Sequence, residues 1–339
     1  MKKTLVALAT LAATSAFAQS TVTLYGVADQ GYNTDKKTVG TATSKTTGLK
    51  SILSNSRLGF KGTEDLNGGL KANFVMEYGV ETDEATTSMA NRQSFVGLTG
   101  GFGSVNLGRQ YTQIHGVQSA FDANGNAAAA GWLGNGTSTT RQSNAIVYTT
   151  PTFSGFSAAA ELGHAEVPQT SAATGNAGNT TALGLTYANG PLTVKAATES
   201  IKLTALTYTA PGAAALTLSN ALANRKANSI GASYDLGVAK LMFVSTSAKA
   251  GSTADAGKVT TNNFGVSVPM GAVTLNATAS TGKYTDSGAA SVKTSGYQVG
   301  ANYALSKRTT AYALLGQGKD KAATAAKHET VAVGIRHTF

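Results

Sequence analysis

The stretch 56–78 most strongly constrains the fold of this chain, because its apolar and polar residues alternate strictly. In its first run, Leu58 and Phe60 alternate with Arg57 and Lys61. Such period-2 alternation is typical of β-strands with one apolar face and one wet face. The turn D-L-N-G-G that follows tolerates positive φ, so the two runs are predicted to close as an antiparallel hairpin.

The second run of this hairpin places charged residues opposite an apolar row. Lys71, Asn73, Val75 and Glu77 alternate with apolar residues from Leu70 onward. The polar face therefore carries full charges of both signs at several depths. That pattern favours a barrel with lipid outside and water inside over a sandwich with a dry core.

Alternating runs of this kind recur to the C-terminus, and we count sixteen of them. Short and long connections alternate, and the spacing suits strands of about ten residues tilted across a bilayer. Free sheet edges would expose unpaired backbone groups to hydrocarbon, so the sheet must close. The predicted fold is an all-β, sixteen-stranded antiparallel transmembrane β-barrel with both termini at the short-turn end. A barrel of this size leaves an aqueous channel.

Three stretches interrupt the alternation. Residues 35–50 read as a polar loop, and residues 202–227 read as irregular. Between Arg109 and Ser143 alternation fails for more than thirty residues, and a loop of that length is usually functional. We predict that this third loop folds into the lumen and narrows it.

The N-terminus has the order of a secretory signal peptide: a basic start, an apolar stretch and a small-residue cleavage site. We predict cleavage after Ala18, so that 1–18 is removed and 19–339 forms the barrel domain.

The formal charge is +10, but the basic residues are scattered, which argues against nucleic acid as a partner. We expect the positive field to act on small anions. The chain has no cysteine, which excludes disulfides.

Arginine and lysine residues on wet faces and at loop ends are the candidates for a basic pore constriction. Arginine suits a pore wall because its guanidinium is always charged and its planar donors match carboxylate, sulfate and phosphate. A ring of such groups attracts anions. The alternative for each residue is an ordinary wetted lumen or loop charge. The predicted cluster is Arg57, Arg92, Arg141, Lys71 and Arg109.

Two acidic residues complete the predicted constriction. Glu77 shares a face with Lys71, and Asp122 lies in the third loop, where the alternative is a solvated carboxylate. Either residue could set a transverse field or form an ion pair. We expect Arg57 and Glu77 to lie near the same height, with their separation deciding between these two roles.

Catalytic interpretations find little support. The four histidines have no metal-ligand partner at a useful spacing, and nothing ties Ser, His and Asp into a triad. We therefore expect no enzyme activity, no cofactor and no metal site.

Several motifs together resemble the general porins of Gram-negative bacteria, particularly the betaproteobacterial branch. They are V-T-L-Y-G-V-A-D, S-R-L-G-F-K-G-T-E-D-L-N-G-G-L-K-A, R-Q-S-F-V-G-L, G-F-G-S-V-N-L-G-R-Q-Y-T, Y-D-L-G-V-A-K, Y-A-L-S-K-R-T and V-G-I-R-H-T-F. In that family a basic cluster matches Arg57, Arg92 and, more loosely, Arg141, while a glutamate matches Glu77. The resemblance implies that Phe339 is the terminal signal read by the barrel assembly machinery.

The resemblance also implies sixteen-stranded homotrimers in the cell outer membrane, in contact with its lipid and lipopolysaccharide. The third loop departs from the family, with A-F-D-A-N-G-N-A from Ala120 where A-F-D-P-F-G is common. We expect a general diffusion porin that passes small hydrophilic solutes passively and prefers anions. The alternatives are a solute-specific channel and, from another class, a barrel enzyme or adhesin.

Overall fold

A computed structural model describes most of the chain. The described residues are 21–83, 91–124, 139–165, 178–202, 206–208, 216–218, 224–250, 257–285, 291–322 and 325–339. The predicted signal peptide, 1–18, lies outside them. So do residues 125–138 of the third loop, including part of the segment that departs from the family pattern. Within the described residues, no helix is long and apolar enough to cross a membrane.

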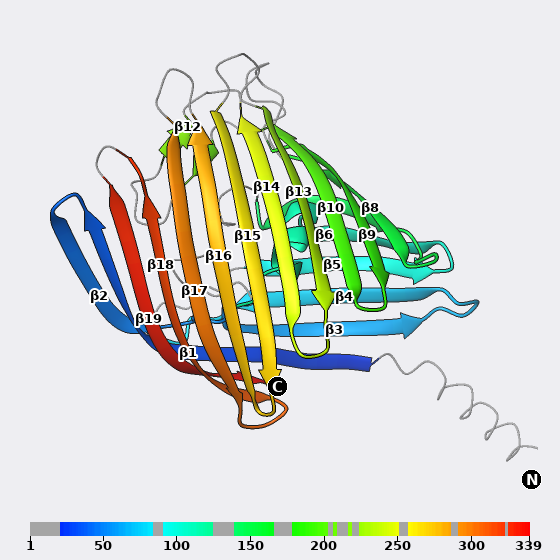
Figure 1. The fold of residues 1–339 in the computed structure, drawn as a ribbon. Helices are drawn as coiled ribbons and strands as arrows, with labels where there is room; N and C mark the ends of the chain where they lie inside the picture. The colour runs from blue at the N-terminus through cyan, green and yellow to red at the C-terminus, as the bar shows by residue number, and fades with distance from the viewer. Residues whose placement is uncertain are drawn as a thin grey trace, which may run out of the picture.

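The described strands form one closed antiparallel barrel of sixteen wall positions (Figure 1). β1 (Thr21–Val39) pairs with β2 (Ala42–Lys50) along one half and with β3 (Arg57–Asp65) along the other. β2 and β3 therefore share a single wall position. β1 also pairs with the last strand, β19 (Ala326–Thr338), which closes the sheet. The predicted fold and strand number are confirmed.

The remaining strands follow each other around the wall in chain order. They are β4 (Lys71–Gly79), β5 (Asn91–Gly100), β6 (Gly103–Tyr111), β7 (Arg141–Thr149), β8 (Phe156–Gly163), β9 (Thr180–Asn189), β10 (Leu192–Lys202), β13 (Asn224–Asp235), β14 (Lys240–Ala250), β15 (Gly257–Met270), β16 (Val273–Thr285), β17 (Val292–Ala304) and β18 (Thr309–Asp320).

The predicted hairpin is β3 and β4, and its faces are oriented as the alternation indicates. Gly59 pairs with Glu77, and Phe60 pairs with Met76. Phe60 and Met76 are 39% and 46% exposed on the outside of the barrel, whereas Glu77 is 5% exposed. The apolar face is the outer one because lipid solvates it, while the charged face borders the lumen.

Two stretches expected to be loops contain strands instead. Residues 35–50 form the end of β1, a turn with Gly40 at φ 57° and all of β2. Their threonines are β-branched and favour extended backbone even though both faces are polar. In the region 202–227, β11 (Leu206–Tyr208) pairs with β12 (Leu216–Leu218) in a separate two-stranded sheet, and β13 already begins at Asn224.

The wall is uneven in height. Strands β13 to β19 are 11 to 14 residues long and stand as a tall wall in Figure 1. Strands β3 to β8 have only 8 to 10 residues. The start of β1 and the end of β19 lie together at the short-turn end, as predicted, where Gly26 N–H donates to the Phe339 carbonyl at 3.0 Å.

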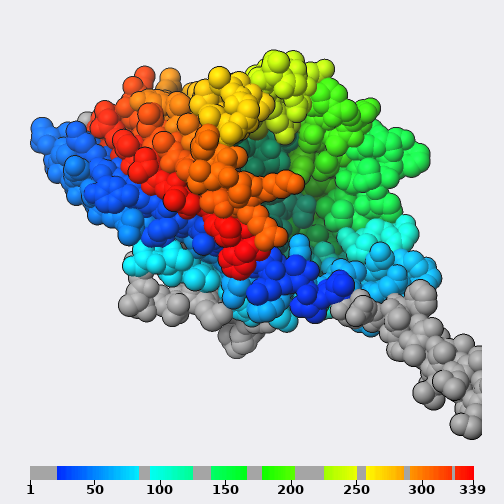
Figure 2. Space-filling view, turned by 90° about the horizontal axis from the view of Figure 1, so that it is seen from below, coloured from blue at the N-terminus to red at the C-terminus, as the bar shows by residue number. Residues whose placement is uncertain are grey.

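A short helix, α2 (Gln113–Ala120), lies inside the barrel against β10, β13 and β14. Ile114, Val117 and Phe121 are almost fully buried between the helix and this wall. Gly231 on β13 makes room, because a Cβ there would stand 2.2 Å from the Phe121 ring. Figure 2 looks into the short-turn end and shows this segment deep in the hollow between the orange and green walls.

Candidate functional site: the pore constriction

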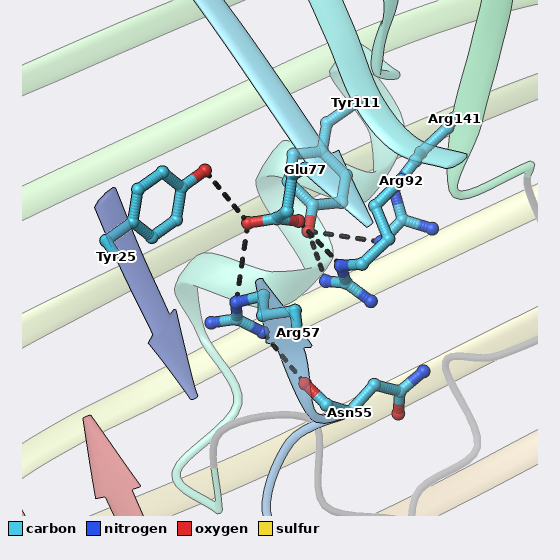
Figure 3. Close-up of polar contacts among 7 residues, drawn as sticks. All are labelled: Tyr25, Asn55, Arg57, Glu77, Arg92, Tyr111 and Arg141. Atoms are coloured by element: carbon cyan, nitrogen blue, oxygen red, sulfur yellow. Dashed lines mark hydrogen bonds and ion pairs between the residues drawn. The ribbon is translucent and has the colours of Figure 1, made fainter. Parts of the chain in front are cut away.

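A buried carboxylate, Glu77 on β4, holds the first part of the site together (Figure 3). Arg92 of β5 donates through Nε to Glu77 Oε1 at 2.6 Å, and Arg57 Nε of β3 lies 3.4 Å from Oε2. The hydroxyl of Tyr25 on β1 donates to Oε2 at 3.2 Å. The expectation that Arg57 and Glu77 share one height is confirmed, and they form an ion pair.

A tyrosine, Tyr111 at the end of β6, holds the second part. Its hydroxyl accepts hydrogen bonds from Arg92 Nη2 at 3.0 Å and from Arg141 Nη2 at 3.2 Å. The Arg141 guanidinium also lies over the Tyr111 ring at 4.7 Å from its centroid, and the His115 ring stacks on that ring at 4.8 Å. Two arginines from different strands thus share one phenol, as Figure 3 shows.

Local backbone features explain how these side chains reach the lumen. Gly59 lacks a Cβ that would otherwise stand 2.4 Å from the Tyr25 ring, so that ring can cross β3 to reach Glu77. Between Gly108 and Gln110 the β6–β7 register shifts, and Gly108 has φ 134°. Such bulges redirect the side chains that follow, here Tyr111.

The third loop crosses the lumen and is tied to the opposite wall. Thr112 caps α2 by accepting from the His115 N–H at 3.2 Å. Gln118 donates to Thr246 of β14 at 3.2 Å, and Asn124 donates to Thr278 of β16 at 3.1 Å. The loop therefore spans from β6 to the far side of the barrel, as predicted for a constriction.

The segment between β2 and β3 also enters the lumen. Ile52 and Leu53 pack against Tyr312 of β18 in a small buried cluster. Asp29 of β1 accepts from the N–H groups of Ile52 and Ser54 at 3.1 and 2.9 Å. This second inward segment was not predicted, because in sequence it is only a short gap in the alternation.

The loop and the wall enclose a cavity of about 930 Å³. Among the described residues, four arginines line it: Arg57, Arg92, Arg141 and Arg336. Asp122 also lines the cavity and accepts from the Asn124 N–H at 3.0 Å, whereas Glu77 lies behind Arg57 and Arg92. These four guanidiniums and two carboxylates of the described residues give a formal charge of +2 around the cavity.

Two members of the predicted basic cluster lie elsewhere. Lys71 is exposed at the turn end of β4, six residues from Glu77. Arg109 lies within β6 rather than in the loop, and its Nη1 donates to Ser143 at 2.8 Å. Neither is among the described residues that line the cavity. The structure therefore brings together Arg57, Arg92 and Arg141 but not these two residues.

His115 faces the arginines from α2. Burial, together with the nearby charges of Arg141 and Arg92, lowers the pKa of its imidazole to about 4. The ring is therefore neutral near pH 7 and adds no charge to the cavity there.

Tyr25, Tyr111 and Arg336 were not among the predicted site residues. Parity could have indicated Arg336, because Val333 and Ile335 of β19 face outward and Arg336 has the opposite parity. Tyr25 has the opposite parity to Val22 and Leu24, and because all three side chains are suited to face lipid, alternation alone did not decide which set points outward. The structure places Val22 and Leu24 outside. Tyr111 depends on the bulge in β6, which alternation does not reveal.

The barrel is closed and sixteen-stranded, its outer residues are apolar, and an inward loop narrows its charged cavity. This architecture defines a porin, which is a passive channel and not an enzyme. The chain belongs to the Gram-negative porin family, whose family model matches residues 4–323. It is accordingly an outer-membrane protein.

Known proteins agree along the whole chain. Outer membrane porin protein 32 of Delftia acidovorans is 35% identical, with 100% of each chain covered. The structure of the anion-selective porin from Comamonas acidovorans matches with a TM-score of 0.78 and 27% identity, over 95% of this chain and all of the other. The trimer form of OmpT from Vibrio cholerae shares the fold, with a TM-score of 0.68 and 16% identity, over 94% of this chain and 99% of the other.

Proposed function

We propose that this porin is a general diffusion channel that prefers anions, and that Arg57, Arg92, Arg141 and Arg336 give it that preference. The observation that carries the proposal is the shared anchoring of three guanidiniums on Glu77 and Tyr111 beside the cavity. Anchored guanidiniums keep their charge at a fixed place, and rings of such charges select ions of opposite sign.

The two acidic residues have different roles in this proposal. Glu77 is buried against Arg57 and Arg92, so it positions these arginines and offsets part of their charge. Asp122 lines the cavity on the loop side, where its Oδ1 accepts from the Asn124 N–H. Asp122 on the loop side and the arginines Arg57, Arg92 and Arg141 on the wall side would together set a transverse field across the lumen. Glu77 instead forms a local ion pair.

The wider assembly is also proposed. A trimer is supported by the trimer form of OmpT and by the shared fold. Removal of 1–18 as a signal peptide is supported by the order of its segments and by the outer-membrane family. Recognition of Phe339 by the barrel assembly machinery is supported by its place at the closing pair of strands, where its N–H donates to the Gly26 carbonyl at 3.2 Å.

The test is the reversal potential of the channel in planar bilayers under a salt gradient. Replacing Arg57, Arg92 and Arg141 with glutamine should shift it toward cations. A unit charge about 8 Å away changes an ion's energy by about 0.5 kcal/mol in water, so loss of three charges should lower anion permeability about tenfold and raise cation permeability by a similar factor. Lys71→Gln with Arg109→Gln is the matched control, and it should shift the potential far less.

An unchanged potential in the arginine variant would remove these residues from selectivity. An equal shift in the control would assign the preference to net charge rather than to the cavity. The same recordings address the alternative of a solute-specific channel, since conduction through a solute-specific channel saturates with solute concentration.

A further inference from the structure

The segment 51–56 leaves the barrel wall between β2 and β3 and turns into the lumen, and we call it the β2–β3 shelf. β1 pairs with β2 as far as Lys50 and with β3 from Arg57, so the shelf belongs to no strand of the wall. Connections between strands usually run over the outer surface, where water solvates their backbone groups. An inward course therefore needs contacts that hold it.

A buried carboxylate, that of Asp29 on β1, holds the middle of the shelf. Asp29 is 0% exposed. Its Oδ1 accepts from the Ile52 N–H at 3.1 Å and from the Tyr312 hydroxyl at 2.7 Å, and its Oδ2 accepts from the Ser54 N–H at 2.9 Å. Among the ion pairs between described residues, none includes Asp29. A buried carboxylate is costly unless hydrogen bonds satisfy it, so the shelf cannot leave β1 without exposing this group or removing its donors.

Two serines fix the ends of the shelf to the backbone of the same residue. The hydroxyls of Ser51 and Ser56 each donate to the Asp29 carbonyl at 3.0 Å, and their oxygens lie 2.9 Å apart. The Ser56 hydroxyl also accepts from the Asp29 N–H at 2.9 Å. The start, the middle and the end of the shelf are thus all tied to one position on β1.

A pair of glycines gives the shelf its seat on the wall. Gly31 of β1 pairs with Gly334 of β19. A Cβ at Gly31 would stand 2.6 Å from the Tyr312 hydroxyl and 2.7 Å from Ile52 Cγ1, and a Cβ at Gly334 would stand 2.4 Å from the same hydroxyl. Tyr312 therefore crosses two strands to reach Asp29, and Ile52 packs where a side chain of β1 would otherwise lie.

The shelf presents polar groups to the constriction. Leu53, Ser54 and Asn55 line the same cavity as the arginines and the third loop. The carbonyl of Asn55 accepts from Arg57 Nη1 at 3.3 Å, as Figure 3 shows, and Asn55 itself is exposed. A solute in the cavity therefore meets a neutral amide beside the Arg57 guanidinium, and it meets the shelf and the third loop together.

We propose that the β2–β3 shelf is a second constriction element, which sets with the third loop the largest solute that passes. Asn55 is the shelf residue that solutes contact, and Asp29 is the positioning residue that holds the shelf in the lumen. The inference rests on the proposed diffusion channel. It concerns size rather than charge, so it can be tested with neutral solutes, to which the arginines offer no charge selection.

The first test measures whether residue 55 lies in the path of the current. The chain has no cysteine, so Asn55→Cys introduces a single thiol that 2-sulfonatoethyl methanethiosulfonate can modify in planar bilayers. The added group is bulky and negatively charged, so single-channel conductance should fall and anion permeability should drop about twofold. Thr47→Cys is the matched control, because it has the parity of Leu49, which is 55% exposed on the outer face. Its modification should leave the current unchanged.

The second test releases the shelf and measures size exclusion with neutral maltooligosaccharides of increasing length in swelling liposomes. Asp29→Ala removes both carboxylate oxygens, so longer oligosaccharides should enter and conductance should rise. Asp29→Asn keeps one acceptor oxygen and should have a smaller effect. Asp235→Ala is the matched control, since Asp235 also accepts from a backbone N–H, that of Gly237 at 2.8 Å, but on an exposed short turn. In the combined Asp29→Ala and Asn55→Cys variant, the reagent should block less.

Any of three results would overturn the proposal: modified Asn55→Cys that conducts as before, an equal block in Thr47→Cys, or a folded Asp29→Ala barrel with the oligosaccharide limit of the wild type. The thiol test leaves every contact of Asp29 in place, so it decides the matter even if Asp29→Ala fails to fold. The oligosaccharide limit is independent of ion preference, so a failure here is distinguishable from a failure of the proposed selectivity.

Discussion

Arg92 donates through Nε to Glu77 Oε1 at 2.6 Å, and both side chains are less than 10% exposed although they border a water-filled lumen. Glu77 also lies 3.4 Å from Arg57, so one carboxylate serves two arginines of the proposed selectivity site. Removing one partner of a buried pair leaves its counter-charge uncompensated. The Glu77 position thus connects barrel stability with pore charge.

Glu77→Gln is expected to make the pore more anion-selective and the barrel less stable. One negative charge is lost, so anion permeability should rise about twofold and cation permeability should fall by a similar factor. Loss of one partner of a buried pair costs about 3 kcal/mol, which should lower the temperature at which the folded barrel converts to its heat-denatured form on gels. Glu64→Gln, on the exposed end of β3, is the control and should change neither quantity. A rise in cation preference would contradict the assignment of Glu77.

Tyr111→Phe should loosen the arginines without changing the net charge. Arg92 and Arg141 each lose a hydrogen-bond acceptor, while the ring under Arg141 and beside His115 remains. We expect greater current noise in the open channel and a nearly unchanged reversal potential. Tyr111→Leu also removes the ring contacts and should add to the noise. If both variants record like the wild type, Tyr111 does not position the arginines.

Gly231→Val should displace the third loop. The Cβ of residue 231 would stand 2.2 Å from the Phe121 ring, so either the ring or the helix must move. Because α2 narrows the lumen, a displaced loop should change single-channel conductance. Gly48→Ala is the control, since nothing lies within 4 Å of its added Cβ. Unaltered conductance in a folded Gly231→Val barrel would show that Phe121 does not fix the loop.

The pH dependence of the channel should reflect His115. Burial and the nearby arginines lower the pKa of this imidazole to about 4, so it should stay neutral from pH 8 to pH 5. Below that range it gains a proton and anion preference should rise, a step that His115→Gln should abolish. Because the folded-state pKa of His115 is lowered, the contribution of this residue to the free energy of unfolding is complete above the ordinary histidine pKa of about 6.5. That contribution is lost as pH falls toward 4. A selectivity step centred near pH 6.5 would contradict this burial.

Alternation predicted the parts of this molecule that depend on the difference between lipid and water. The outward Phe60 and Met76 and the inward Arg57 and Glu77 follow from a period of two. Alternation could not predict the side-chain contacts inside the lumen, because these join residues of strands that are distant in sequence. The burial of Phe121 against Gly231 and the bond from Asn124 to Thr278 depend on how the loop crosses the barrel, which no local pattern encodes. Likewise, the exclusion of Arg109 from the cavity depends on the irregular β6–β7 register.

Phe339 offers a prediction that separates barrel closure from recognition during assembly. Its N–H and carbonyl pair with Gly26, and its ring covers that glycine, where an added Cβ would stand 2.3 Å from the ring. Phe339→Ala keeps both backbone bonds, so refolding of the purified chain in detergent should reach nearly the wild-type yield. In cells, the proposed recognition by the assembly machinery requires the ring, and the amount of folded barrel in the outer membrane should fall severalfold. Phe264→Ala, which removes another exposed outer ring, is the matched control and should reduce neither yield. Equal losses in detergent and in cells would mean that Phe339 acts through closure of the barrel, because a purely structural contact is needed in both settings.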